Sequence, residues 1–282
     1  MSNARRDHSS ARLSRWDGRA RRNLADAVTR LGRVPAAAVA PVVTDLDLAD
    51  LPPPAQRYLR WMGVVGAPRV ATVHARFRGQ IRLKPGQRWM PFDGWQFDAA
   101  VPITRLIHMR IAVAGLIPMF GTDTYAQGVG RMHGKLLGLV TVADGEGPEF
   151  DLGELVTWLN DAALLAPSML LIPACRWTAV DDRSFDVTVT DAANVVTARF
   201  VVDDDGRLVD FRTDDRWYAG TNPPTRATWS TPLDGWTTTT DGRPLPTTAS
   251  AVWHLPEGDF TYVRGAFDPA LVEFDRAPSS TV

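Results

Sequence analysis

The sequence predicts a mainly β protein of the α+β type: a curved antiparallel half-barrel wrapped around a central amphipathic helix, with further helices at the N-terminus. Beyond residue 70, apolar and polar side chains alternate with the two-residue period of half-buried strands. Short strand patterns follow one another at near-regular spacing, as in an antiparallel barrel or half-barrel. One helical pattern stands among them, within residues 131–177. A sheet that curves around this helix satisfies all three observations.

Composition places the chain among ordinary globular proteins. It has 282 residues, 45% of them hydrophobic and 22% charged, which is enough to bury a sizeable core. Its net charge of −1 offers no field for nucleic acid. Cys175 is the single cysteine, so no intrachain disulfide can form. The apolar runs are shorter than the ~20 residues of a membrane span, and the N-terminus lacks the apolar core of a secretory signal. We therefore expect a cytoplasmic protein.

Residues 1–33 form an arginine-rich segment with the pattern of an amphipathic helix. Its apolar side chains recur at three- and four-residue steps: Leu13, Trp16, Ala20, Leu24, Ala27 and Leu31. The favoured interpretation is that this modest, alanine-rich stripe packs on the body of the protein. The alternative is peripheral contact with anionic lipid through residues 1–33. Residues 34–50, with prolines among alanines, are predicted to be a linker.

Residues 51–276 are predicted to form one β-rich domain, and residues 277–282 a disordered tail. Prolines at 52–54 begin a short helix that Gly63 ends. Strand patterns start at Ala71. Glycines within residues 125–142 indicate bulges or sharp curvature.

The central helix carries a stripe of apolar side chains that should face the sheet: Leu152, Leu155, Val156, Leu159 and Ala163. Asp151 as N-cap and Glu154 three residues later match a capping box. Glu149, Glu154 and His133 are the candidate acid–base residues. The competing interpretation, which we favour for the glutamates, is that Glu154 caps the helix and Glu149 lies near the positive end of its dipole.

No metal or cofactor site is predicted. The five histidines are scattered, without a His-x-His or HExxH spacing. His74, His108 and His133 would converge only if their strands were neighbours. The glycines of residues 128–134 miss the spacing of a nucleotide-binding loop.

An apolar ligand pocket is the main functional prediction. Ten tryptophans are more than a core needs, and Trp and Met suit an adaptable apolar pocket. Arginines on strands, such as Arg105 and Arg110, are expected to face outward. The residues predicted to contact a ligand are Trp89, Phe92, Trp95, Tyr125, Arg131, Lys135, Trp158, Trp229, Trp253, Tyr262 and Arg264.

A series of short motifs resembles a bacterial family, frequent in actinobacteria, that is known only as a domain of unknown function. The resemblance covers about Leu51 to Phe274. The motifs are RYL at 57–59, WMPF at 89–92, DTY at 123–125, KLLGLV at 135–140, GPE at 147–149, GE at 153–154, ND and LLAP within 160–167, DDR at 214–216, WSTP at 229–232, and WHLPEG with FTYVRG within 253–265.

The resemblance implies a sheet with a helix laid across its concave face, which looks like the half-barrel of bacterial lipoprotein carriers. Acidic positions shared with the family are Glu149, Glu154 and Asp215, with no role attached to them. Two functions remain open. One is binding of a lipid, isoprenoid or polyketide-like molecule in an apolar pocket. The other is a cofactor-free isomerase, cyclase or hydratase that works in the same pocket.

Overall fold

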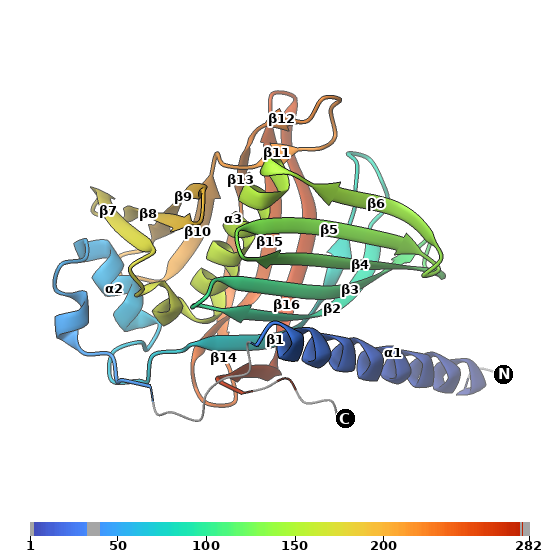
Figure 1. Ribbon diagram of the computed structural model, residues 1–282, viewed down its shortest axis with the longest axis horizontal. Helices are drawn as coiled ribbons and strands as arrows, with labels where there is room; N and C mark the ends of the chain where they lie inside the picture. Colours follow the sequence, from blue (N-terminus) through green and yellow to red (C-terminus); the bar gives the residue numbers. More distant parts are fainter. Residues whose placement is uncertain (1–2, 33–39, 277, 279–282) are drawn as a thin grey trace.

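The computed structural model describes residues 3–32, 40–276 and 278, with the side chains of Trp16 and of the described residues from Gly18 onward (Figure 1). Its helices are α1 (Asn3–Arg30), α2 (Pro53–Trp61) and α3 (Pro148–Leu165), with 3-10 turns at Asp45–Leu48 and Pro167–Leu170. The strands are β1 (Thr72–Ile81), β2 (Met90–Ala99), β3 (Thr104–Val113), β4 (Ile117–Ala126), β5 (Val129–Leu136), β6 (Val140–Glu146), β7 (Cys175–Asp181), β8 (Ser184–Asp191), β9 (Asn194–Val202), β10 (Leu208–Thr213), β11 (Trp217–Tyr218), β12 (Thr225–Arg226), β13 (Thr228–Ser230), β14 (Leu233–Thr238), β15 (Pro244–Leu255) and β16 (Gly258–Phe274).

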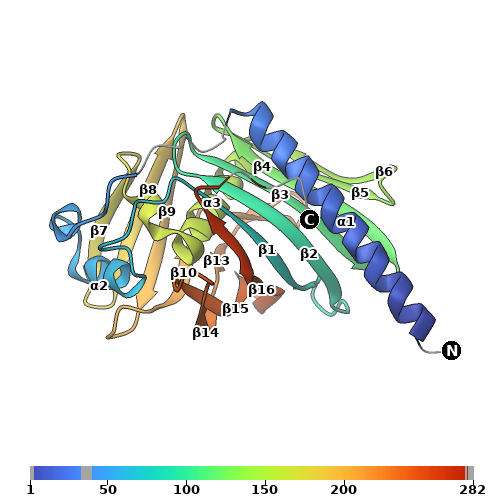
Figure 2. The ribbon, with the colours of Figure 1, turned by 90° about the horizontal axis from the view of Figure 1, so that it is seen from below.

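Nearly all the strands belong to one antiparallel sheet. Its order is β6-β5-β4-β3-β2-β1-β16-β15-β13-β10-β9-β8-β7, and β14 pairs with β15. The chain builds the sheet as successive hairpins, so β1 meets β16 in the middle and β6 and β7 stay as open edges. The sheet curves around α3 without closing (Figures 1 and 2). The predicted fold class is confirmed.

Helix α3 lies against the concave face and divides the interior. Its predicted apolar stripe is buried in the largest core cluster, where Leu155 and Leu159 are fully enclosed. Toward β8–β10 this core is filled by stacked aromatic rings, with the ring centroids of Phe185 and Phe200 5.0 Å apart. Tyr58 of α2 joins them and donates a 2.6 Å hydrogen bond to the Ala163 carbonyl. One side of α3 is therefore solidly packed.

Two glycines let the first turn of α3 touch the sheet. A Cβ at Gly130 of β5 would lie 2.3 Å from the Phe150 carbonyl oxygen, and one at Gly145 of β6 would lie 2.2 Å from the Phe150 ring. Close helix–strand approach thus explains part of the glycine enrichment. Curvature explains another part, since the β5–β6 register shifts at Gly134, as the sequence predicted for this region.

The stripe of α1 packs on the convex face of the sheet (Figure 2). Leu24 and Val28 are fully buried against Phe97 of β2 and Leu106 of β3. Arg21 lies over the Trp95 ring at 4.8 Å. The favoured interpretation of this segment holds for the described side chains. Ala20, Leu24 and Val28 are covered by the sheet, so contact with lipid cannot use these three side chains.

The domain begins earlier in the chain than predicted, because part of the predicted linker at 34–50 packs on it. Residues 33–39 lie outside the described part of the chain. From residue 40 the backbone packs on the domain: Val43 and Leu48 are fully buried, and the Val43 amide donates to the Ala67 carbonyl at 2.9 Å. Buried leucine and valine side chains hold this stretch in place. The predicted tail at 277–282 lies outside the described residues except for Pro278, which is buried.

We expect Gly130→Ala to destabilise the protein by about 2–3 kcal/mol, because backbone atoms of α3 would have to move away from the new methyl group. The matched control is Gly153→Ala within α3, where the added Cβ meets nothing within 4 Å. That change should be neutral or stabilise by up to about 1 kcal/mol. Denaturant unfolding of both variants measures the difference, and equal effects would contradict tight docking at Gly130.

Candidate functional site

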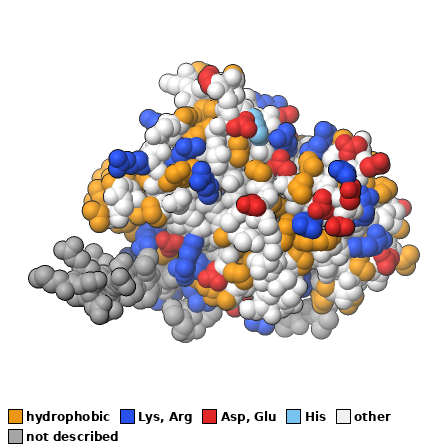
Figure 3. Space-filling model, turned by 180° about the vertical axis from the view of Figure 1, so that it is seen from behind, with side chains coloured by type: hydrophobic (Ala, Val, Ile, Leu, Met, Phe, Trp, Pro, Cys, Tyr) orange, Lys and Arg blue, Asp and Glu red, His pale blue; other side chains and the backbone are white. Residues whose placement is uncertain are grey.

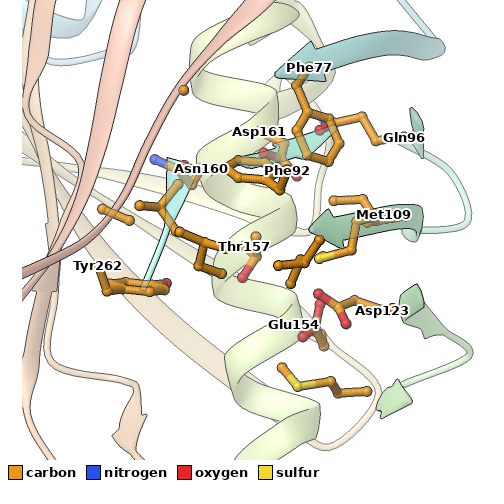
Figure 4. A pocket seen from close by; sticks show the side chains of 18 of the residues that line it. Phe77, Phe92, Gln96, Met109, Asp123, Glu154, Thr157, Asn160, Asp161 and Tyr262 are labelled. Carbon is orange, nitrogen blue, oxygen red and sulfur yellow. The ribbon is translucent and has the colours of Figure 1, made fainter. Parts of the chain in front are cut away.

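A cavity of about 480 Å³ occupies the second side of α3, under the half of the sheet formed by β1–β5, β15 and β16 (Figure 4). This volume lies within the range of small-molecule sites in proteins. Its walls are mainly apolar. Phe77 and Phe92, with ring centroids 5.5 Å apart, form one wall, and the other apolar lining includes Ile81, Ile107, Met109, Ile111, Met119, Met132, Leu164, Val263 and Phe267.

The strands supply this lining because inward side chains recur every second residue. On β3 the inward set is Arg105, Ile107, Met109 and Ile111, whereas Leu106 faces α1. Gly121 of β4 leaves room for the Met109 side chain, because a Cβ at position 121 would lie only 2.9 Å from the Met109 Cγ.

Helix α3 contributes a polar stripe to the cavity. Glu154, Thr157 and Asp161 recur at steps of three and four residues, so they lie on one helical face, and Figure 4 shows all three beside the cavity. Asn160 lies next to them and donates a 2.6 Å hydrogen bond to the Thr231 hydroxyl. The helix thus presents an apolar face to the core and a polar face to the cavity.

Arg105 joins the polar stripe to the sheet. Its Nη1 donates to Glu154 Oε2 at 2.6 Å, and its Nε donates to Asp161 Oδ2 at 2.8 Å. The three side chains are 4%, 3% and 9% exposed, so these are buried ion pairs. Burial disfavours the charge of Arg105, but the two carboxylates outweigh it and raise its pKa, so the guanidinium stays protonated.

Carboxyl groups outnumber cations in this cluster. Burial raises the pKa of Glu154 to about 7, with the Arg105 charge opposing the shift and the Asp123 charge adding to it. Burial also raises the pKa of Asp123, which lines the cavity from β4 next to Glu154 (Figure 4). Burial raises the pKa of Asp161 as well. Near neutral pH some of these groups therefore hold protons and can both donate and accept them.

Asp98 and Arg216 complete the cluster. Burial and the Asp161 charge raise the pKa of Asp98 well above its usual range, and Gln96 donates to its Oδ2 at 2.8 Å. Arg216 also lines the cavity and lies 4.4 Å from the centroid of the Trp229 ring. Its charge lowers the pKa of Asp123, although burial dominates there.

Several predicted residues do line the cavity. Among the aromatic candidates these are Phe92, Trp229 and Tyr262, with the Trp229 indole donating to the Tyr262 hydroxyl at 3.2 Å. Among the acid–base candidates they are Glu154 and His133. His133 is 39% exposed and lies 3.4 Å from Asp144, so it borders the cavity near solvent.

The other predicted ligand contacts lie elsewhere, each for a local reason. Trp95 packs under α1, and Trp158 is fully buried and donates to the Ala99 carbonyl. Trp89 stacks with Arg264, whose guanidinium is 4.4 Å from its ring centroid. The remaining four are Tyr125, which donates a hydrogen bond to Asp191; Arg131, in an ion pair with Glu146; Lys135, exposed on β5; and Trp253, packed on Tyr218.

The capping interpretation of Glu154 is wrong. Gly147 is the N-cap of α3, so Glu154 lies two turns inside the helix and reaches Arg105. Asp151 is also inside the helix and accepts a 2.7 Å hydrogen bond from the Gly130 amide. Glu149 lies in the first turn, as the dipole argument expected, but it is exposed and outside the cavity.

Arg105 and Asp123 line the cavity, but the sequence patterns do not predict them as site residues. Arg105 was expected to face outward with the other strand arginines, since its position in an alternating pattern does not tell which face is buried. The signal for them lies on the helix: Glu154, Thr157 and Asp161 share one face of a segment whose other residues are mostly apolar. A buried helix with such a stripe needs partners for it, and a strand arginine is the obvious one.

Comparisons with known proteins identify the family. Residues 41–265 match a family described as "Family of unknown function (DUF6544)", so the chain belongs to that family and the resemblance seen in the motifs is confirmed. No curated protein matches the chain. Among solved structures it is similar to a "putative outer membrane lipoprotein-sorting protein domain from Vibrio parahaemolyticus". That likeness has a TM-score of 0.38 and 8% identity, and covers 72% of this chain and 85% of the other.

Among the described residues, His, Cys, Asp and Glu form no group of three or more that could hold a metal ion. No helix in the described part of the chain is both long and apolar enough to cross a membrane.

The raised pKa of Glu154 predicts a pH-dependent stability. The folded value of about 7 lies above the ordinary 4.5, so the folded state holds this proton more tightly than the unfolded chain does. The resulting stabilisation is complete below about pH 4.5 and is lost as the pH rises through about 7. Glu154→Gln should reduce the fall in unfolding free energy over this window by about 3 kcal/mol.

Denaturant unfolding between pH 5 and 8, in steps of about one unit, measures this slope. Glu149→Gln is the control, because it removes an exposed glutamate from the same helix. It should keep the wild-type slope. A wild-type slope in Glu154→Gln as well would show that Glu154 is not protonated in the folded state.

Proposed function

We propose that this protein binds a hydrophobic small molecule, of lipid, isoprenoid or polyketide-like chemistry, in the cavity beside α3. The observation that carries the proposal is the cavity itself: about 480 Å³ lined mainly by aromatic, methionine and aliphatic side chains. Empty apolar space of this size in a folded core costs stability, so occupation by an apolar ligand is favourable.

The lining supports an adaptable ligand site. Met109, Met119 and Met132 come from three neighbouring strands, and unbranched thioether side chains can repack around different shapes. The polar cluster at one wall would fix the orientation of a ligand that carries one polar end. Arg216, Asp123 and Thr157 are the cavity groups placed to meet that end.

Filling the cavity from α3 should abolish binding. Thr157→Trp would project an indole into the space (Figure 4), whereas Thr237→Trp makes the same change at an exposed site on β14. We expect native mass spectrometry of the wild type and of Thr237→Trp to show a co-purifying apolar molecule. Once that molecule has been removed by organic extraction, both proteins should bind the apolar dye Nile red.

Thr157→Trp should bind the dye at least about tenfold more weakly, because the indole occupies the volume that the ligand needs. Circular dichroism and unfolding curves check that it folds. Equal binding by both tryptophan variants would place the ligand outside this cavity.

A second candidate function is favoured by one observation: the carboxyl groups of Glu154 and Asp123 both line the cavity, and Glu154 has a pKa of about 7. A general acid or base works best when its pKa is near the working pH. We infer a cofactor-free enzyme that moves a proton on the bound apolar molecule, as an isomerase, cyclase or hydratase does, with Glu154 as the acid–base group.

Incubation of the co-purified ligand with the protein in D₂O tests this role. Proton removal and return by Glu154 would place deuterium on a carbon of the ligand, read by mass spectrometry. Glu154→Gln should slow this exchange by about 100-fold or more, while Glu149→Gln leaves it unchanged. A wild-type protein that holds the ligand but exchanges no proton on it is a binding protein and not this enzyme.

A further inference from the structure

Three hairpin turns meet at one end of the sheet. They are the β1–β2 turn (82–89), the β3–β4 turn (114–116) and the β5–β6 turn (137–139). The strand registers place them together, since Phe92, Ile111, Met119 and Leu136 are successive cross-strand partners in the last rungs before the turns. The Leu137 amide also donates to the Pro118 carbonyl at 2.8 Å, which ties the second and third hairpins to each other.

These turns expose leucines to an unusual degree. The exposed fractions are 89% for Leu116, 83% for Leu139, 56% for Leu137 and 51% for Leu83. We name these four side chains the hairpin-tip surface. Figure 3 shows hydrophobic side chains gathered at this end of the molecule, with Lys and Arg side chains among them. Single exposed leucines are ordinary, but a cluster on adjacent turns marks a contact surface.

The charged residues within these three turns are all positive. Residues 82–89 contain Arg82, Lys84 and Arg88, and residues 113–117 and 136–140 contain no charged residue. Lys84 and Arg88 are exposed. Leucines that project beyond a basic rim fit a bilayer with anionic headgroups, where leucine enters the acyl region and the cations stay among the phosphates.

The cavity opens beside the same surface. Leu83 and Val142 line the cavity and are each about half exposed, at 51% and 50%, so they form its mouth. A molecule soluble in lipid and not in water would then pass between bilayer and cavity along an apolar path. This path between bilayer and cavity rests on the proposed function, whereas the exposed leucines and the positive charges of the turns do not.

We propose that the hairpin-tip surface docks on anionic membrane surfaces and that the cavity faces the bilayer in the docked state. This contact differs from the one considered for residues 1–33, because it uses the turns of the sheet and not the stripe of α1, which is buried on β2 and β3.

Vesicle co-sedimentation of the full chain tests the proposal, with phosphatidylcholine vesicles and with phosphatidylcholine–phosphatidylglycerol vesicles. The wild type should bind the anionic vesicles more tightly, and salt should weaken that preference. The double variant L116D/L139D should bind at least about tenfold more weakly, because two inserted leucines become carboxylates. Leu46→Asp is the matched control: Leu46 is 86% exposed, in the 3-10 turn before α2. It should bind as the wild type does.

A second pair of variants separates charge from insertion. K84Q/R88Q should lose about fivefold per residue on anionic vesicles and keep the weaker binding to neutral ones. Thr157→Trp fills the cavity without touching the turns, so it should bind vesicles normally even if the cavity binds no ligand.

Three results would overturn the proposal. The first is no vesicle binding by the wild type. The second is unchanged binding by L116D/L139D, which would assign the contact to another part of the chain. The third is a wild-type dimer in sedimentation velocity that the double variant dissociates, because a second copy of the chain would then cover the leucines.

Discussion

The buried ion pairs of Arg105 with Glu154 and Asp161 are the constraint on which the arrangement of this protein depends. They connect β3 to the middle of α3, in a place where the side chains have lost almost all contact with water. A charge left alone there would cost about 3–5 kcal/mol, so the helix is held at the position where every member has a partner. All three side chains also line the cavity.

The interior is thus two environments on either side of one helix. Toward β8–β10, aromatic rings stack around Phe185 and Phe200 and fill the space. Toward β1–β5, the glycines and methionines of the strands leave room. Buried carboxyl groups outnumber the cations beside them. Burial raises the pKa of Glu154 to about 7, and the charge of the neighbouring Asp123 adds to that shift. A purely structural ion pair needs no such excess, which is why the same cluster supports binding and, as a second candidate, proton transfer.

Local patterns predicted much of the fold. The two-residue alternation marked the strands, the three- and four-residue steps marked α1 and α3, and the glycines of the β5–β6 region marked the bulge at Gly134. The site was harder to predict, because tryptophan frequency indicates apolar surroundings but not which ones. Trp229 borders the cavity, whereas Trp158 anchors α3 and Trp95 receives α1. Each is well buried, and nothing near it in sequence separates these roles.

By itself, then, the sequence determined the class of fold, the family motifs and the two amphipathic helices, because each depends on residues close together in the chain. Only the tertiary structure decided which face of each strand is inside. That choice turned Arg105 from an expected surface charge into the partner of Glu154, and it placed Asp123 at the cavity. The reason is physical: in a sheet covered on both faces, by α3 on one and α1 on the other, apolar residues point both ways. Alternation then no longer distinguishes inward from outward, and only the contacts between distant elements do.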